Sequence, residues 1–429
     1  MSAVVVFIIF AICLVIAIPI SISLGIVAVL PGAFDTSFTA SAGYVIRSMV
    51  GGIDSFPLLA VPMFVLAGIL MAHGKISEKL FDVFVYFLGN KRAGIPCAVI
   101  ITCLFYGAIS GSAPATVAAV GSMTIPLLIE LGYEKDFSTA IVAVAGGLGV
   151  IIPPSIPFIM YAMATGESVS DLFLAGIVPG MMISALLIFY AYYYCRRHGE
   201  DREKIQEKMD QLKEKGFFNI LKESIWALLS PVIVLGCIYT GVASPTEAAV
   251  ISVFYSLFVS LFIYKSIKVK QIWGIMVEAM KTYAPILFIL ATSTAFSRVL
   301  TLMQVPQDVS VWIMTHFSNE IVLLLVINVV LLIVGMVMDT TPAILILSPI
   351  LLPIVQHVGM NPIHFGVMMI VNLAVGFVTP PVGVNLFVAS SLTNVPMMQI
   401  AKKAMPMIGY FLLALLLIAF IPAISLCLL

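Results

Sequence analysis

The chain has 429 residues, of which 62% are hydrophobic and 10% are charged, and its 21 basic residues balance its 21 acidic residues. Soluble domains are roughly 45–50% apolar and about 25% charged. The composition therefore excludes a soluble enzyme and a disordered protein, and the zero net charge excludes a nucleic-acid-binding protein. Apolar runs long enough to cross a bilayer recur throughout, so we expect an all-α polytopic membrane protein.

The apolar runs predict the elements in chain order. Residues 4–30 form a retained first helix rather than a signal peptide, because no basic residue precedes them and the run is too long. The first unit (1–195) is expected to hold scaffold helices over 4–73, a hairpin over 94–130, a broken helix over 138–164 and a helix over 172–195. After a linker (196–222) and a connecting helix (223–242), the second unit (243–429) holds scaffold helices over 247–300, a hairpin over 320–356, a broken helix over 364–392 and a helix over 405–428.

Two of these runs, 94–130 and 320–356, are too long for one crossing of about 20 residues. Small polar clusters split them at Ser110–Pro114 and Asp339–Pro342. Each run is either two short crossings or one re-entrant hairpin, and both alternatives return the chain to the side from which it came.

The positive residues predict the orientation. With residue 1 in the cytoplasm, 18 of the 21 Lys and Arg residues fall on one side, and the opposite loops 31–43, 165–171, 243–246 and 357–363 hold none. Because positive residues concentrate on the cytoplasmic side, we expect a cytoplasmic N-terminus and linker and a periplasmic C-terminus.

The two units resemble each other. Glycine and proline positions recur at one constant offset along the chain, among them Gly149 with Gly376, Pro153 with Pro380, and Pro154 with Pro381. The single helix 223–242 between the units turns the second one upside down. Inverted repeats of this kind are typical of secondary transporters, which alternate between two arrangements of similar energy.

Double prolines must interrupt two helices, since proline lacks an N–H and clashes in a helix interior. Unpaired backbone groups in a bilayer survive only where they line a cavity or gain partners. Freed carbonyls suit a hard cation such as Na⁺, and freed amides suit an anion. Together with Ser110, Gly111 and Ser112 in one hairpin, and Asp339, Thr340 and Thr341 in the other, the breaks predict two symmetry-related ion sites.

Two intramembrane charges are candidates for function, because such charges are costly. Asp339 at the second hairpin tip is the stronger one. Arg298 could receive a substrate carboxylate, pair with an acid, or extend to the outer surface; these alternatives stay open.

Several motifs, quoted in chain order, resemble the large membrane subunit of tripartite ATP-independent periplasmic (TRAP) transporters over essentially the whole chain. They are Asp54-Ser55-Phe56-Pro57, Gly107-Ala108-Ile109-Ser110-Gly111-Ser112-Ala113-Pro114, Ile152-Pro153-Pro154-Ser155, Ser244-Pro245-Thr246-Glu247, Met338-Asp339-Thr340-Thr341-Pro342 and Thr379-Pro380-Pro381-Val382-Gly383.

The resemblance implies a bacterial inner-membrane importer of organic acids, including C4-dicarboxylates and sialic acids, driven by Na⁺. It implies two partners, a small four-helix membrane subunit and a periplasmic substrate-binding protein, and an elevator-type fold in which a transport domain moves against a scaffold. The general similarity to this family slightly favours sialic acid as the substrate.

The resemblance also implies site residues. One Na⁺ would be held by Ser110, Gly111, Ser112 and the carbonyls around Gly149 to Pro153, and another by Asp339, Thr340, Thr341 and the carbonyls around Gly376 to Thr379. The substrate would lie near Ser112, Ser155, Thr341 and Asn385, with Arg298 as a cationic helper.

Three other functions are compatible with parts of the pattern. A symporter for dicarboxylate or citrate that works alone would need no binding protein. A channel would repeat its charged or carbonyl ring by oligomerisation, whereas this repeat is internal. An intramembrane protease would need a nucleophile with a base, or a second deep acid beside Asp339.

Overall fold

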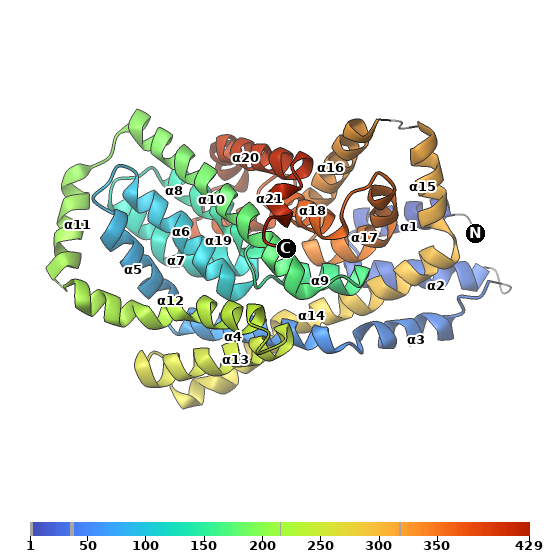
Figure 1. Cartoon of the computed structure of the whole chain (residues 1–429), viewed down its shortest axis with the longest axis horizontal. Coiled ribbons are helices and arrows are strands. Elements are labelled where there is room, and N and C mark those ends of the chain that lie inside the picture. Colours follow the sequence, from blue (N-terminus) through green and yellow to red (C-terminus); the bar gives the residue numbers. More distant parts are fainter. Residues whose placement is uncertain (1–2, 35–37, 215, 317–318) are drawn as a thin grey trace.

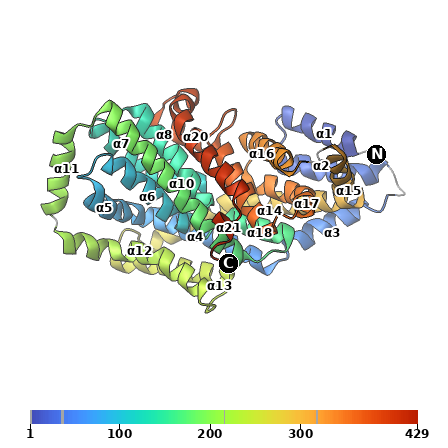
Figure 2. The same cartoon turned by 45° about the horizontal axis from the view of Figure 1, so that its top comes forward.

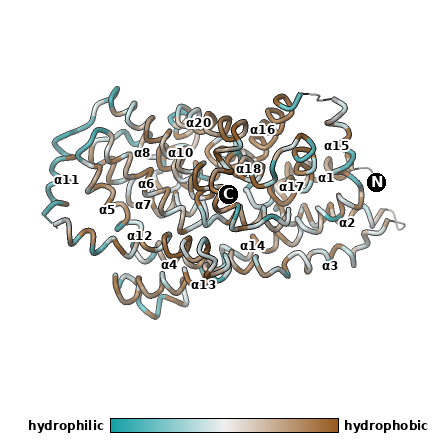
Figure 3. The backbone as a smooth tube through the Cα atoms, viewed as in Figure 1, coloured by the Kyte–Doolittle hydropathy of each residue, from teal (hydrophilic) through white to brown (hydrophobic). Residues whose placement is uncertain are grey.

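The computed structural model describes residues 3–34, 38–214, 216–316 and 319–429, and every regular element within them is a helix. Nine helices in this part of the chain are long and apolar enough to cross a membrane. The expected all-α membrane fold is therefore confirmed. Hydrophilic residues gather over α11 at one end of the long axis, while the middle of the molecule is largely hydrophobic (Figure 3).

The first half contains α1 (Ala3–Val15), α2 (Ile20–Phe34), α3 (Ala42–Ile53), η1 (Phe56–Leu59), α4 (Ala60–His73), α5 (Ile76–Leu88), α6 (Gly94–Ser110), α7 (Ala113–Glu130), α8 (Lys135–Ala145), η2 (Gly146–Val150), α9 (Ile156–Thr165) and α10 (Val169–His198). The charged helix α11 (Arg202–Glu214) then runs across the end of the molecule and joins α10 to α12 (Figure 1).

The second half contains α12 (Phe217–Tyr239), α13 (Pro245–Phe258), the π-helical turn η3 (Val259–Ile263), α14 (Val269–Leu302), α15 (Val305–His316), α16 (Glu320–Val337), α17 (Thr340–His357), α18 (Pro362–Gly376), α19 (Val384–Thr393), α20 (Met397–Phe420) and α21 (Ala423–Leu426).

The two halves follow one plan. α6 and α16 end at Ser110 and Val337, and α7 and α17 end at Glu130 and His357, so both pairs of ends are related by the same offset as the repeated glycines and prolines. The pair α6–α7 lies toward the α11 end, whereas α16–α17 lies toward the end that carries the N-terminus (Figures 1 and 2). The hairpins thus enter the molecule from opposite ends, as an inverted arrangement requires.

One buried core joins both hairpins and both broken helices with α10 and α20, and residues of α4, α5, α12, α13 and α14 extend it. A second, smaller core lies between α1, α2, α3, α14 and the start of α15, and it reaches the first body through Ile346 and Ile350 of α17. α3 and α4 pack along α14, and α4 also packs along α13. The molecule is therefore built from a hairpin-containing body and a set of long flanking helices.

The expectation of one helix over residues 4–30 is wrong. α1 ends at Val15, Ala17 adopts a left-handed conformation with φ 63°, and α2 begins at Ile20 after Pro19. The two helices pack on each other, and the N-terminus lies at the same end of the molecule as the end of α2 (Figures 1 and 2). Proline, which cannot continue the hydrogen-bond ladder, explains the break. The loop 31–43, which was used above to predict the orientation, lies partly outside the described residues, since 35–37 are not among them.

Other boundaries also differ from those expected. Within the scaffold helices expected over 4–73, η1 separates α3 from α4, and Pro57 of η1 follows the turn at Asp54 and Ser55. The last long helix is α20, which begins well before residue 405 and ends at Phe420. Helices α5 and α15, which no long apolar run indicated, precede the two hairpins in equivalent places.

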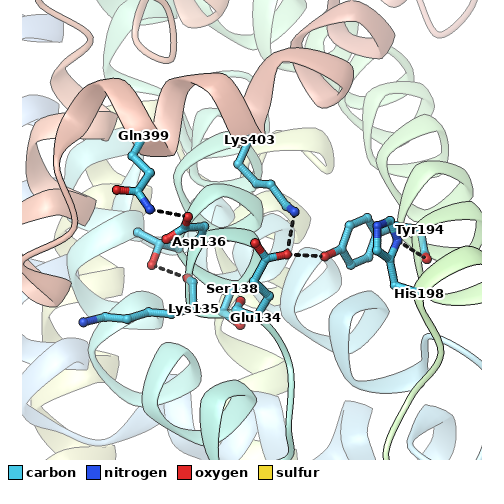
Figure 4. A network of polar contacts seen from close by, with 9 residues as sticks. Glu134, Lys135, Asp136, Ser138, Tyr194, His198, Gln399 and Lys403 are labelled. Carbon is cyan, nitrogen blue, oxygen red and sulfur yellow. Dashed lines mark hydrogen bonds and ion pairs between the residues drawn. The ribbon is translucent and has the colours of Figure 1, made fainter.

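A polar network ties the hairpin-containing body together at the α11 end (Figure 4). Glu134, just before α8, accepts a hydrogen bond from the Tyr194 hydroxyl of α10 at 2.9 Å and pairs with Lys403 of α20. The Lys403 ammonium also lies 5.2 Å from the centre of the Tyr194 ring. Asp136 accepts from the Gln399 side chain at 2.6 Å. The start of α8 is thereby fastened to α10 and α20.

The hydrogen bond from Lys403 is the main reason that the pKa of Glu134 lies below its ordinary value. A lowered folded-state pKa stabilises the protein above the ordinary carboxyl range, and this contribution disappears as the pH falls through the lowered value. We expect Lys403→Met to lower the melting temperature at pH 7 by about 1–2 °C, since a half-exposed pair contributes less than about 1 kcal/mol.

The measurement is thermal unfolding in detergent at pH 7 and at about pH 3, below the ordinary carboxyl pKa. Lys402→Met is the matched control and should unfold like the parent, because Lys402 is exposed on the same turn. A deficit for Lys403→Met that persists unchanged at the lower pH would contradict the role given to Glu134.

Candidate ion and substrate site

The tip of the first hairpin is a tight turn held by hydroxyl groups. α6 ends at Ser110, Gly111 has φ 60°, and α7 begins at Ala113. The Ser110 Oγ lies 3.0 Å from the Thr116 Oγ1, which donates to the Ser112 carbonyl at 2.8 Å. The tip therefore gathers hydroxyl and carbonyl oxygens without a charged side chain.

The first broken helix meets this tip through its backbone. α8 continues into the three-ten turn η2 before α9 begins at Ile156. A Cβ added at Gly149 would lie 2.7 Å from the Ser112 carbonyl oxygen, so glycine is what permits the approach. The Ile156 N–H donates to the Gly111 carbonyl at 3.3 Å. The structure thus brings Gly111, Ser112 and Gly149 together, and their role in binding Na⁺ stays a prediction.

The turn that follows contains Pro153 and Ser155, with a cis peptide bond between Pro153 and Pro154. Ser155 is fully buried. Its hydroxyl donates to the Val150 carbonyl at 2.6 Å and accepts the Phe158 N–H at 3.5 Å. Ser155 consequently caps α9 and closes the break.

The tip of the second hairpin carries the carboxylate. Asp339 caps α17, and its Oδ1 accepts the Thr340 N–H at 2.8 Å. Thr340 and Thr341 are buried, whereas Asp339 is exposed. Within the described residues no Lys, Arg or His lies within ion-pair distance of Asp339. A carboxyl group with no such partner, beside two hydroxyls, is a suitable donor set for a cation.

The second broken helix approaches this hairpin as the first does. A Cβ added at Gly376 would lie 2.3 Å from the carbonyl carbon of Gly335 in α16. The Val382 N–H donates to the Met336 carbonyl at 3.1 Å. The Thr379 hydroxyl, by contrast, donates back to its own helix, to the Val375 carbonyl at 2.8 Å, so only the Thr379 carbonyl stays a candidate ligand.

The two sites therefore share one construction. In each, a glycine of the broken helix touches a glycine of the hairpin: Gly149 meets Gly107, and Gly376 meets Gly335. In each, a backbone N–H after the break donates to a carbonyl at or near the hairpin tip. The chemical difference is the Asp339 carboxylate, which only the second site has.

Arg298 lines a pocket of about 310 Å³ between the long flanking helices and the hairpin-containing body. Its guanidinium is exposed and has no carboxylate partner within the described part of the chain. The other polar lining comes from Ser55, Thr294 and Ser297, and the body contributes Leu345 and Pro349 of α17. A free cation beside small hydroxyls suits an acidic group.

The other four residues predicted to contact substrate do not line this pocket. Ser112 is half-buried at the first tip, and Thr341 lies one helical turn before the pocket residue Leu345. Ser155 and Asn385 are fully buried. Their assignment to substrate binding stays a prediction.

Several residues of these sites were not predicted from the sequence. Thr116 supplies the hydroxyl that joins the first tip, and Thr294 and Ser297 face the Arg298 pocket. Gly107 and Gly335 are separated by nearly the same offset as the repeated glycines and prolines, so the repeat could have revealed them. No local pattern marked Thr294, since its place depends on how α14 packs.

The family model described as "Tripartite ATP-independent periplasmic transporter, DctM component" matches residues 7–424. The isethionate TRAP transporter permease protein DctMQ of Oleidesulfovibrio alaskensis is 43% identical over 97% of this chain, which spans 64% of that relative's length. The C4-dicarboxylate TRAP transporter large permease protein DctM of Pseudomonas aeruginosa is 39% identical over 87% of this chain and 86% of its own. The 2,3-diketo-L-gulonate TRAP transporter large permease protein of Escherichia coli is 35% identical over 88% of this chain and 87% of its own length.

Solved structures of similar fold include the YdaH transporter of Alcanivorax borkumensis, with a TM-score of 0.64 and 14% identity over 93% of this chain and 96% of that one. MtrF of Neisseria gonorrhoeae gives a TM-score of 0.63 and 15% identity over 93% of each chain. At these identities the likeness concerns the fold alone.

The glycine contact at the second site generates a stability prediction. Gly376→Ala should lower the melting temperature in detergent, because its Cβ would collide with the backbone of Gly335 and neither helix can yield without separating. Overpacking of this kind costs about 1–3 kcal/mol. Gly409→Ala in α20 is the control, since nothing lies within 4 Å of the added Cβ, and it should be neutral or slightly stabilising. Equal melting temperatures for the two variants would contradict the contact.

Proposed function

Because the chain belongs to the DctM family of TRAP transporter components, we propose that it is a Na⁺-coupled large permease subunit that imports an organic acid across the bacterial inner membrane. The observation that carries this proposal is the pair of sites in which a hairpin tip meets an interrupted helix. Such pairs of broken elements near mid-membrane are how secondary transporters bind ions and substrates.

Two Na⁺ sites follow from the donor atoms. The first comprises the hydroxyls of Ser110 and Ser112 with carbonyls from Gly111 and from Gly149 to Pro153. The second comprises Asp339, Thr340 and Thr341 with carbonyls from Gly376 to Thr379. Hydroxyls, carbonyl dipoles and one carboxylate provide hard oxygen ligands for a small cation. The glycines at both breaks fit this role, because a Cβ at either would fill the space beside the tip.

The substrate is a small organic acid whose acidic group is received by Arg298. Ser112 and Thr341, at the two tips, are the further contacts, whereas Ser155 and Asn385 hold the breaks in place. Relatives named for isethionate, C4-dicarboxylate and 2,3-diketo-L-gulonate favour a small acid of this kind over sialic acid. The family's tripartite description supports two partners, a small membrane subunit and a periplasmic binding protein that delivers the acid.

Transport follows an elevator mechanism. The moving part is the body with both hairpins, both broken helices, α10 and α20, whose buried core also contacts α4, α12 and α13. The long helices α2, α3, α4, α13 and α14 are the scaffold against which it moves. The Arg298 pocket at the boundary of these two parts supports this division, because its lining comes from both.

One experiment tests this function and the residues assigned to its ion and substrate sites. Proteoliposomes containing the chain, the small subunit and the cognate binding protein should accumulate a C4-dicarboxylate only with an inward Na⁺ gradient. Asp339→Asn combined with Ser112→Ala should abolish the Na⁺ dependence. Arg298→Gln should instead raise the KM for the acid about tenfold or more, since a charged hydrogen bond contributes about 1.5–3 kcal/mol, while the Na⁺ dependence is kept.

Three outcomes would count against the proposal. Intact Na⁺-driven uptake in the Asp339/Ser112 double variant would refute the ion sites. An unchanged KM in Arg298→Gln would refute the substrate contact. Full uptake without the binding protein would favour a symporter that works alone.

The helical hairpin α1–α2 changes the orientation proposed for the N-terminus. The positive residues still place α11 in the cytoplasm and the C-terminus outside. Since α1 and α2 return the chain to the same end, we place the N-terminus in the periplasm rather than the cytoplasm.

A membrane-impermeant maleimide applied to spheroplasts measures this orientation. Ala3→Cys, made in a Cys427→Ser background, should be labelled. In the parent protein the native Cys427, which is exposed, should also be labelled. Gln206→Cys in the exposed face of α11 should react only after permeabilisation. Protection of Ala3→Cys in intact spheroplasts would return the N-terminus to the cytoplasm.

A further inference from the structure

Asn385 connects the two broken helices to each other. It lies in the first turn of α19 and is fully buried. Its Nδ2 donates to the carbonyl of Ala143 in the other half of the chain at 3.0 Å. This is a direct polar contact between the second interrupted helix and the first.

The two carbonyl groups that accept hydrogen bonds from Asn385 lie beside the two breaks. Ala143 lies in the last turn of α8, directly before the three-ten turn η2 of the first site. The backbone N–H of Asn385 donates at 3.0 Å to the carbonyl of Phe377, which lies at the start of the second break. One residue thus holds a carbonyl beside each site.

The repeat does not require this bond. Val150 and Phe377 occupy equivalent positions in the two units, and each carbonyl is closed by a donor near the start of the following half-helix, Ser155 in the first and Asn385 in the second. The residue of the first unit that is equivalent to Asn385 is Phe158, whose side chain cannot donate. Among the described residues, the side-chain bond between the breaks is therefore made by the second half.

We propose that Asn385 is a positioning residue that couples cation binding at the two sites. This inference rests on the proposed Na⁺ coupling. A cation that orders the turn from Gly376 to Asn385 also fixes the amide that holds α8, so the backbone around Gly149 is set for the other cation. Coupling between sites is reciprocal, and each cation raises the affinity for the other.

The test is the Na⁺ dependence of uptake by the complete complex in proteoliposomes, with thermal unfolding measured on each variant. Asn385→Leu has a similar volume, removes the Nδ2 donor and also removes a buried Oδ1 that has no partner among the described residues. We expect the parent to show a Hill coefficient above 1. In Asn385→Leu it should fall to about 1, and half-saturation should need about fivefold more Na⁺ or higher.

Asn372→Leu is the matched control. Asn372 is likewise fully buried with an unpaired Oδ1, but its Nδ2 bonds to Asn328 of α16, at 2.8 Å from the Asn328 Oδ1, and does not join the two breaks. It should keep the Hill coefficient of the parent. An equal loss in both variants, or none in Asn385→Leu, would overturn the coupling.

A second measurement does not depend on the folding of an Asn385 variant. In the parent complex, Na⁺ should slow hydrogen exchange of the amides at 146–152, and Asp339→Asn should weaken this protection although it lies at the other site. Undiminished protection would overturn the inference. Uptake that needs no Na⁺ at all would instead refute the proposed function, so the two failures are distinguishable.

Discussion

A backbone group that lies within a membrane must find a partner inside the protein, because lipid offers none. This chain interrupts two helices where the ladder cannot supply those partners, and the rest of the architecture follows from how they are replaced. A hairpin tip approaches each break closely enough to exchange backbone hydrogen bonds, and glycine pairs make that distance possible. Hydroxyl and carbonyl or carboxylate oxygens gather at each tip beside the break, which is an environment that suits a small cation.

The two copies of this arrangement are similar but not equivalent. Asp339 gives the second site a negative charge, whereas the first tip offers only hydroxyls and carbonyls. Asn385 extends from the second copy to the first and has no counterpart in return. In the function that we propose, the symmetry lets one fold present alternative arrangements to the two sides of the membrane. The departures from symmetry would then give the two sites different tasks.

Much of this fold could be predicted from the residues. Long apolar runs indicated the membrane class, the split runs indicated the hairpins, and double prolines indicated the two breaks, because proline has a direct effect on backbone hydrogen bonding. Residues 4–30 were misjudged, since the run is apolar throughout and its single Pro19 resembles the prolines that other helices here tolerate, such as Pro179 in α10. Helices α5 and α15 were not predicted, because neither lies in a long apolar run.

The candidate site was predictable in part for the same reason. Ser112, Gly149 and Gly376 occupy positions that the motif and the repeat define, and the structure places each where a hairpin meets a break. The Arg298 pocket and the bond from Asn385 to Ala143 depend on packing between segments far apart in the chain. No local spacing encodes such contacts.

The most direct test of the central claim is the position of bound monovalent cations. A structure of the complex prepared with Tl⁺ in place of Na⁺ should show anomalous density at two places. One lies between Ser110–Ser112 and Gly149–Pro153, and the other between Asp339–Thr341 and Gly376–Thr379. Density at neither place, or cations bound only elsewhere, would contradict the account.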